Sequence, residues 1–172
     1  VKYEKANVTQ NINFNEELKH RIDQHFSSLS PLEWGILKDN ITSIEKFYKN
    51  KVKDFDIIIS SGSSSFSTGD YMSTFLEKKS HIIFKYIRIQ PGRPMIFARY
   101  KSKYIFSLPG NPLAVFVNLM FIVKPFLENP KKSINENIKF IKAGFNDVKK
   151  INTVKFFRVK IKKDIAFPHN SK

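Results

Sequence analysis

Two short stretches of the sequence combine glycine, small polar side chains and the expected start of a helix. The first is residues 61–70, which follow a β-branched run, and the second is residues 108–112. In an open α/β sheet, loops at the carboxyl ends of strands bind anions through backbone N–H groups and helix N-termini. Glycine lets the backbone approach such a ligand closely, and serine or threonine adds donors. Together the two stretches predict a pocket for a phosphorylated or phosphate-like ligand.

A third stretch, residues 90–94, places a cation on a stiff turn. Its sequence is Gln-Pro-Gly-Arg-Pro, in which proline restricts φ and glycine accepts a positive φ. The guanidinium group of Arg93 has the fork geometry that binds an oxyanion through two hydrogen bonds. Each stretch also has a plain structural alternative, because a serine-rich segment is often a linker and a Pro-Gly pair is often only a turn.

Several other chemistries are excluded or find no support. The chain contains no cysteine, which excludes disulfides, thiolate metal sites and cysteine nucleophiles. Residues 62–69 lack the lysine of a Walker A loop and the spacing of a dinucleotide-binding fingerprint. His20 and His25 are five residues apart without a clear carboxylate ligand, which favours surface histidines over a metal site. No Ser/His/Asp arrangement can be argued from the sequence.

The charge of the chain is strongly positive. Among 172 residues there are 30 Lys and Arg against 15 Asp and Glu, a formal net charge of +15. Such a field attracts anions, including nucleic acid, anionic lipid and phosphorylated metabolites. Compositional drift is the alternative, since Lys, Asn, Ile and Phe are abundant together, as in an AT-rich coding sequence. A basic nucleic-acid binder is therefore a hypothesis that only the charge supports.

Periodicity and turn chemistry predict the elements that must position these loops. A helix is expected after Asn15 and a strand over residues 32–37. Thr42 and Glu45 have the spacing of a capping box for the next helix. The apolar run over residues 56–60 predicts a strand buried on both faces.

The second half of the chain has equally clear signals. Asn111 is the expected N-cap of a helix with Pro112 at its first position. The remaining expected elements are a helix after Asp70, a strand over 82–89, a hairpin of 95–100 and 104–108 around 101–103, and a helix reaching about residue 127.

The β-α-β-α-β-β-β-α order predicts an α/β fold, a three-layer sandwich with a mostly parallel sheet and an antiparallel edge hairpin. After residue 130 the pattern changes, and apolar Phe157, Val159 and Ile161 are expected on one face of a strand. We therefore expect an α/β domain over residues 1–130 and the start of a small β-rich domain over residues 131–172. No apolar run approaches the roughly 20 residues of a membrane helix and no signal peptide is visible, so a cytoplasmic protein is expected.

The three loop stretches occur in an order that matches a known family. That family carries a strand ending in Ser-Gly-Gly-Val-Ser-x-Gly-Asp-x-Asp, then Lys-Pro-Gly-Lys-Pro, then Gly-Leu-Pro-Gly-Asn-Pro before an apolar helix. The matching segments here are residues 61–72, 90–94 and 107–112, with weaker matches at 35–40 and 156–159. Over roughly residues 10–130 the chain resembles the molybdopterin-binding domain of the MoeA and gephyrin E-domain family, the molybdopterin molybdenumtransferases.

The resemblance implies a reaction in which adenylylated molybdopterin and molybdate give molybdenum cofactor and AMP, with a divalent cation, usually Mg²⁺. It also implies the fold of the MogA and MoeA proteins and an elongated homodimer. A MogA-type adenylyltransferase is a candidate partner. Neither membrane binding nor specific nucleic-acid binding is expected.

The resemblance also assigns roles to particular residues. Ser67 would donate to molybdate, Arg93 would balance its charge, and Asp70 completes the expected catalytic set. Asp70 and Asp39 would help to bind the cation. The residues expected to hold the pterin and its phosphates are Gly62, Thr68, Gly69, Gln90, Gly92, Pro109, Gly110, Asn111 and Arg158.

Three departures from the family pattern keep alternatives open. Met72 stands where the family has its second aspartate, Gln90 stands in place of the first lysine, and extra serines lengthen the loop before Ser67. The family's strand ending in Thr-Gly-Asp-Glu is absent, which favours a fragment of a longer protein. One alternative is a binding or scaffold module that has lost turnover. The other is a MogA-like molybdopterin adenylyltransferase, although the second and third motifs favour MoeA.

Overall fold

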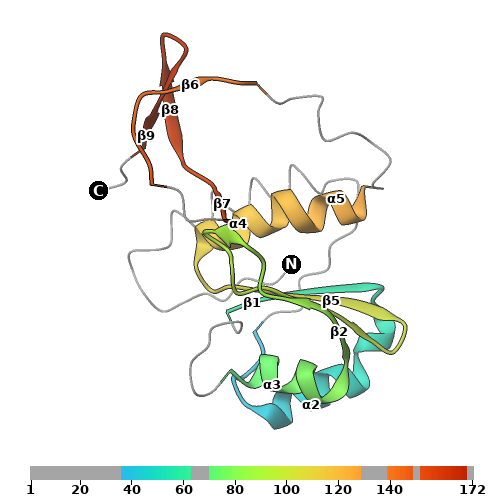
Figure 1. The fold of residues 1–172 in the computed structure, drawn as a ribbon. Helices are drawn as coiled ribbons and strands as arrows, with labels where there is room; N and C mark the ends of the chain where they lie inside the picture. The colour runs from blue at the N-terminus through green and yellow to red at the C-terminus, as the bar shows by residue number, and fades with distance from the viewer. Residues whose placement is uncertain (1–35, 63–69, 129–138, 149–151, 170–172) are drawn as a thin grey trace.

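A computed structural model describes residues 36–62, 70–128, 139–148 and 152–169 (Figure 1). The helix expected after Asn15 lies outside the described residues, as does most of the strand expected over 32–37. Ile36 and Leu37, the two described residues of that expected strand, are not in a strand, so this part of the prediction is wrong. The first described helix, α2 (Ile41–Asn50), begins shortly after them.

The central sheet contains four described strands in the order β1-β5-β4-β2. Their bounds are β1 (Ile57–Ser61), β2 (His81–Lys85), β4 (Ile96–Tyr100) and β5 (Lys103–Leu108). Within this described sheet, the β1–β5 pair is parallel and the β4–β5 and β2–β4 pairs are antiparallel. The expectation of a mostly parallel sheet is therefore corrected. The expected hairpin is confirmed as the β4–β5 pair, whose two-residue connection allows only antiparallel pairing. It lies inside the described sheet and not at its edge, because β2 pairs with β4 in the antiparallel direction.

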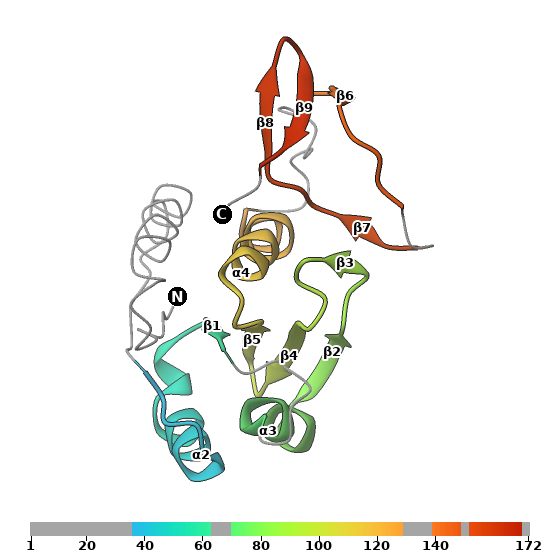
Figure 2. The ribbon, with the colours of Figure 1, turned by 90° about the vertical axis from the view of Figure 1, so that its left-hand side faces the viewer.

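Helices cover both faces of this sheet, which makes the three layers that the sequence predicts (Figures 1 and 2). Helices α2 and α3 (Tyr71–Lys79) lie on one face. A continuous helical run lies on the other face, formed by α4 (Pro112–Asn118), the π-helical η2 (Leu119–Val123) and α5 (Lys124–Leu127). This run confirms the helix expected to reach residue 127.

The alternation of side chains along the strands divides the core between the two faces. In β4, Ile96 and Ala98 pack with α2 and α3, whereas Phe97 packs with the helical run on the opposite face. In β1, Ile58 packs on the face covered by α2 and α3, while Ile57 and Ile59 pack on the face covered by the helical run. The strand is thus covered on both faces, as its unbroken apolar run predicts.

Helix starts agree with the sequence in two of three places. Asn111 and Asp70 are the N-caps of α4 and α3, and Pro112 is in the first turn of α4. For α2 the expected capping box is wrong. The N-cap is Asn40, whose side chain accepts a hydrogen bond from the Ser43 N–H at 2.9 Å. Asparagine caps as well as threonine or better, and from Asn40 the helix begins earlier and contains Thr42.

The strand expected over residues 82–89 is interrupted. Strand β2 ends at Lys85, Tyr86 has a φ of 62°, and a short strand β3 (Ile89–Gln90) follows. Strand β3 leaves the central sheet and pairs in parallel with β7 (Val154–Lys155). A positive φ at a non-glycine residue cannot continue a strand, so the chain changes direction at Tyr86.

The C-terminal segment forms a second sheet from β6 (Lys142–Ala143), β9 (Ile165–Pro168) and β8 (Val159–Lys162), in that order. It approaches the first unit through the β3–β7 pair and through the rings of Phe121 and Phe156, whose centroids are 4.4 Å apart. The division of the chain at residue 130 stays a prediction. Within the described ranges no helix is long and apolar enough to cross a membrane.

Candidate functional site

Strand directions bring four strand ends to one edge of the central sheet. Parallel strands β1 and β5 end together, with Ser61 in register with Leu108. Strand β4 is antiparallel to β5 and therefore begins at this edge, where Ile96 is opposite Ser107. Strand β2 in turn ends there, with Lys85 opposite Ile96. All three loop stretches singled out in the sequence leave or enter the sheet at this edge.

The two glycine loops lie directly beside each other. A Cβ atom added to Gly110 would be 3.4 Å from the Cα atom of Gly62, so the two backbones are almost in contact. Gly62 has a φ of 101°, a conformation that favours glycine. Both glycines are exposed, and Asn111 beside Gly110 is exposed as well. A ligand at this edge can therefore reach the backbone of both loops.

The second loop leads into a well-formed helix start. The Oδ1 atom of Asn111 accepts hydrogen bonds from the N–H groups of Leu113 at 3.0 Å and Ala114 at 3.2 Å. Pro109 is buried and anchors the loop, whereas the following residues are exposed. The cap holds the backbone around Gly110 in place at the edge of the sheet.

The turn at residues 90–94 lies at the same edge. Gly92 has a φ of 113°, as expected for the glycine of this turn. The carbonyl of Arg93 accepts hydrogen bonds from the N–H groups of Ile87 at 3.1 Å and Met95 at 2.9 Å. The side chains of Gln90 and Arg93 are exposed. The turn is therefore rigid in its backbone and accessible in its side chains.

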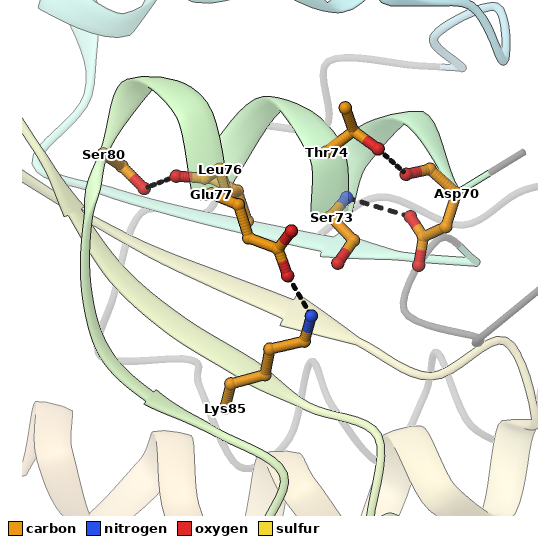
Figure 3. Close-up of polar contacts among 7 residues, drawn as sticks. All are labelled: Asp70, Ser73, Thr74, Leu76, Glu77, Ser80 and Lys85. Atoms are coloured by element: carbon orange, nitrogen blue, oxygen red, sulfur yellow. Dashed lines mark hydrogen bonds and ion pairs between the residues drawn. The ribbon is translucent and has the colours of Figure 1, made fainter.

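Acidic and basic side chains lie along α3 and at the neighbouring end of β2 (Figure 3). Asp70 caps α3, and its Oδ1 atom accepts a hydrogen bond from the Ser73 N–H at 2.9 Å. Burial raises the pKa of Asp70, the Ser73 N–H opposes this rise, and the negative charge of Asp39 raises the pKa further. Asp39 and Asp70, the two carboxylates expected to bind a cation, therefore interact electrostatically.

Lys85 is a residue of this edge that no sequence motif indicated. It forms an ion pair with Glu77 of α3 (Figure 3), and its positive charge lowers the pKa of Asp70. Burial alone would lower the pKa of Lys85, but hydrogen bonds to Glu77 and Tyr86 raise it above the ordinary value. Only the observed end of β2 shows that Lys85 belongs to the site, because the sequence predicts a strand that continues past it.

A divalent cation would find few protein ligands here. The described ranges contain no group of three or more His, Cys, Asp or Glu residues that could hold a metal ion. Magnesium is commonly bound by only one or two carboxylates together with substrate phosphates. Two interacting carboxylates, one of them with a raised pKa, fit such a cation, because a positive ion relieves their repulsion.

Several expected site residues cannot be placed. Ser67, Thr68 and Gly69 lie outside the described residues. Arg158 is described and exposed, three residues beyond Lys155. Lys155 is in register with Gln90, and the Phe156 N–H donates to the Gln90 carbonyl at 2.8 Å. The C-terminal segment thus reaches the turn at residues 90–94, but the role of Arg158 stays a prediction.

Met72, which stands where the family has its second aspartate, is buried in this structure. Met72 is 3% exposed and packs in the apolar cluster formed by α2, α3 and the sheet. It is part of the core, so this chain has no carboxylate at that point, and one placed there would be buried among apolar side chains. Gln90, the other departure, is exposed at the edge.

The comparisons with known proteins agree with this geometry. A structure of a MoeA protein from Pyrococcus horikoshii and one of a molybdenum cofactor biosynthesis protein from Pyrococcus furiosus superpose with TM-scores of 0.63 and 0.64 at 20% and 18% identity. The superpositions cover 99% and 91% of this chain, and 42% and 51% of those chains. The fold is therefore that of the MoeA proteins, an α/β sandwich.

Sequence relatives point the same way. A molybdopterin molybdenumtransferase of Staphylococcus aureus is 30% identical over 135 residues, which is 75% of this chain and 32% of the relative. The Haemophilus influenzae protein of the same name is 31% identical over 96 residues, 56% of this chain and 24% of the relative. The chain thus spans about a quarter to a third of these relatives.

A family model described as "Probable molybdopterin binding domain" matches residues 11–129. This match covers more than half of the chain, and it includes all three loops at the edge of the sheet. The chain belongs to this family of molybdopterin-binding domains.

Proposed function

We propose that this chain is the pterin-binding part of a molybdenum insertase, an enzyme of molybdenum cofactor biosynthesis. The reaction converts adenylylated molybdopterin and molybdate to molybdenum cofactor with release of AMP. The observation that carries the proposal is the near contact of Gly62 with Gly110 at the edge that also holds Arg93. Backbone N–H groups and a guanidinium together suit a ligand with several anionic groups.

Each anionic group of the substrates has a candidate partner in the chain. The backbones at Gly62, Gly110 and Asn111 would hold phosphate, because these residues are exposed and closely approached. Arg93 would balance the negative charge of molybdate, and Ser67 would donate a hydrogen bond to it. Such interactions orient the two substrates and reduce the repulsion between two anions.

Asp70 and Asp39 would hold a Mg²⁺ ion together with substrate phosphate. When bound, the cation would polarise the phosphate oxygens and neutralise charge that develops on the leaving AMP. The chain contributes the carboxylates, and Ser73 orients that of Asp70 through its backbone N–H. Lys85 and Glu77 would set the local charge around this pair.

The test is molybdate-dependent release of AMP from adenylylated molybdopterin by the full-length protein. Ser67→Ala and Arg93→Ala should each lower the rate by about a hundredfold or more, the scale on which a donor to a developing anion acts. Arg99→Ala is the matched control. Arg99 is an exposed arginine of β4 near the opposite end of the strand, and its loss should leave the rate within about twofold. Full activity in both site variants would contradict the proposed site.

A second candidate is a module that binds the pterin without turnover. It is favoured by the buried position of Met72, which leaves the chain one carboxylate short of the family pattern. In that case molybdopterin would bind to the full-length protein, but addition of molybdate and Mg²⁺ would release no AMP. The homodimer, the MogA-type partner and the cytoplasmic location also stay proposals that rest on the family.

A further inference from the structure

A buried asparagine connects two of the three loops at the edge. Asn118 is fully buried in the helical run that begins at Asn111, and its Nδ2 atom donates to the Gly92 carbonyl at 3.2 Å. Seven residues correspond to about two helical turns, so Asn118 is on the same helix that the second loop begins. One side chain therefore holds the 90–94 turn against the helix that follows the 108–112 loop.

The packing between Gly92 and Asn118 leaves no space for a side chain. A Cβ atom added at Gly92 would be 3.0 Å from Asn118 Oδ1, 3.1 Å from Ile89 Cδ1 and 3.2 Å from Asn118 Nδ2. Gly92 is itself buried, and its φ of 113° is strained for any other residue. The turn is thus seated directly on the amide group of Asn118.

An apolar residue would be the simpler choice at position 118. Its neighbours Val117 and Leu119 are buried and apolar, and Asn118 Oδ1 has no hydrogen-bond partner among the described residues. A buried polar group without a partner destabilises the folded state. The π-helical stretch also begins with the next residue, and such widened turns occur often at functional sites. An asparagine here thus has a cost that packing alone does not explain.

We propose that Asn118 is a positioning residue, which fixes the Gly92 carbonyl and thereby places Arg93 beside the glycine loops for ligand binding. It does not touch the ligand, since its side chain is fully buried. Only the identity of the ligand rests on the function proposed above. The position of the turn does not depend on that function and can be tested without a ligand.

The experiment uses the full chain and two readouts, backbone hydrogen exchange and fluorescence titration with molybdopterin. Asn118→Leu has a similar volume and lacks the amide. It should accelerate exchange in residues 87–95 and weaken molybdopterin binding about tenfold, as expected for the loss of one buried hydrogen bond. Val123→Ala, a buried residue of the same helical run outside this contact, should leave both readouts within about twofold of the wild-type values.

A second variant tests the same contact from its other side. Gly92→Ala places a Cβ against the amide and should produce the same two effects. If Asn118 acts through Gly92, the double variant should be no weaker in binding than the worse single variant, because both changes break one contact. Fully additive losses would overturn the proposal. If Asn118→Leu does not fold, Gly92→Ala still supplies both readouts.

The outcomes separate this proposal from the proposed function. If the wild-type chain does not bind molybdopterin but Asn118→Leu accelerates exchange in residues 87–95, the function falls and the positioning role stands. If exchange in that segment matches the Val123→Ala control, the positioning role is overturned. If exchange increases but binding is unchanged, the placement of Arg93 does not serve the ligand, and the proposal is also overturned.

Discussion

The two regions of the molecule, residues 36–128 and 139–169, differ sharply in how they use apolar residues. In the described structure, every residue of the buried apolar core belongs to the first region, from Ile44 to Val123. The second region exposes large apolar side chains, including Phe140 at 99%, Val148 at 89% and Ile161 at 55%. Strand β8 has an alternating apolar sequence, but all four of its residues are exposed and no described element covers its apolar face.

This difference shows that a strand pattern alone does not make a core. In the first region two helical layers cover a sheet, and each apolar side chain of β4 finds a partner on its own face. In the second region the described sheet has three short strands and no helix of its own. Small sheets of this kind depend on further packing for their stability. We expect the first region to determine the free energy of unfolding.

The largest expected effect comes from placing a carboxylate in each region. Met72→Asp buries a charge in the core of the first region and should lower the free energy of unfolding by about 4 kcal/mol. Phe157→Asp, at a side chain that is 47% exposed, should change it by no more than about 0.5 kcal/mol. Urea denaturation monitored by circular dichroism measures both. If both variants lost the same free energy of unfolding, the two regions would not differ in their contribution to stability. If Met72→Asp were as stable as wild type, position 72 would be a candidate for the site again.

A smaller effect is expected where the two regions meet. Phe121→Ala removes the ring that packs against Phe156 and should weaken the attachment of the second region by about 1 kcal/mol. Hydrogen exchange in residues 154–156 should accelerate. Phe126→Ala is the matched control, because that ring packs on Phe97, Tyr104 and Phe106 of the sheet instead. If both variants accelerate exchange in residues 154–156 equally, the Phe121–Phe156 contact does not join the regions.

The charged edge of the first region should respond to pH. The folded-state pKa of Asp70 is raised above its ordinary 3.8, so protonation of Asp70 favours the folded state. This contribution is fully present below the ordinary pKa and is lost as the pH rises through the raised value. Asp70→Asn is neutral and still caps the helix, so its stability relative to wild type should increase between about pH 3 and about pH 7.

Thermal denaturation across this range measures the effect. Asp56→Asn, an exposed carboxylate at the opposite end of β1, controls for the general effect of removing one acid. A decrease in the relative stability of Asp70→Asn with rising pH would mean that the charged form of Asp70 stabilises the fold, and the assigned cause would be wrong.

The smallest effect should come from the ion pair beside Asp70. Lys85→Ala breaks the pair with Glu77, whose side chain is 48% exposed, and should cost no more than about 1 kcal/mol. Loss of the lysine charge should also raise the pKa of Asp70, which NMR titration of the carboxylate can follow. Glu77→Gln breaks the same ion pair but removes a negative charge, so the pKa of Asp70 should fall. Shifts of the same sign in both variants would contradict this arrangement.

The sequence predicted those parts of the site whose structure depends on residues close by in the sequence. The N-caps Asn111 and Asp70 and the glycine of the 90–94 turn need only their own turn and the first residues of a helix or strand. The predicted start of α2 is wrong for a reason that is also local. Asn40 and Thr42 are two residues apart and both can cap a helix, and the structure uses Asn40. Roles for Ser67, Arg158 and the two aspartates stay predictions, because no ligand or neighbouring group tests them.

By itself, the sequence determined the layered α/β class, the loops and the turn types, because these follow from the spacing of apolar residues and from the backbone preferences of glycine, proline and asparagine. Only the tertiary structure decided the strand directions, the place of Lys85 beside Asp70 and the burial of Met72. It also decided the contact of Asn118 with Gly92, which joins residues 26 positions apart. Such contacts depend on how whole elements pack, and local preferences carry no information about which side chains a packed edge will bring together.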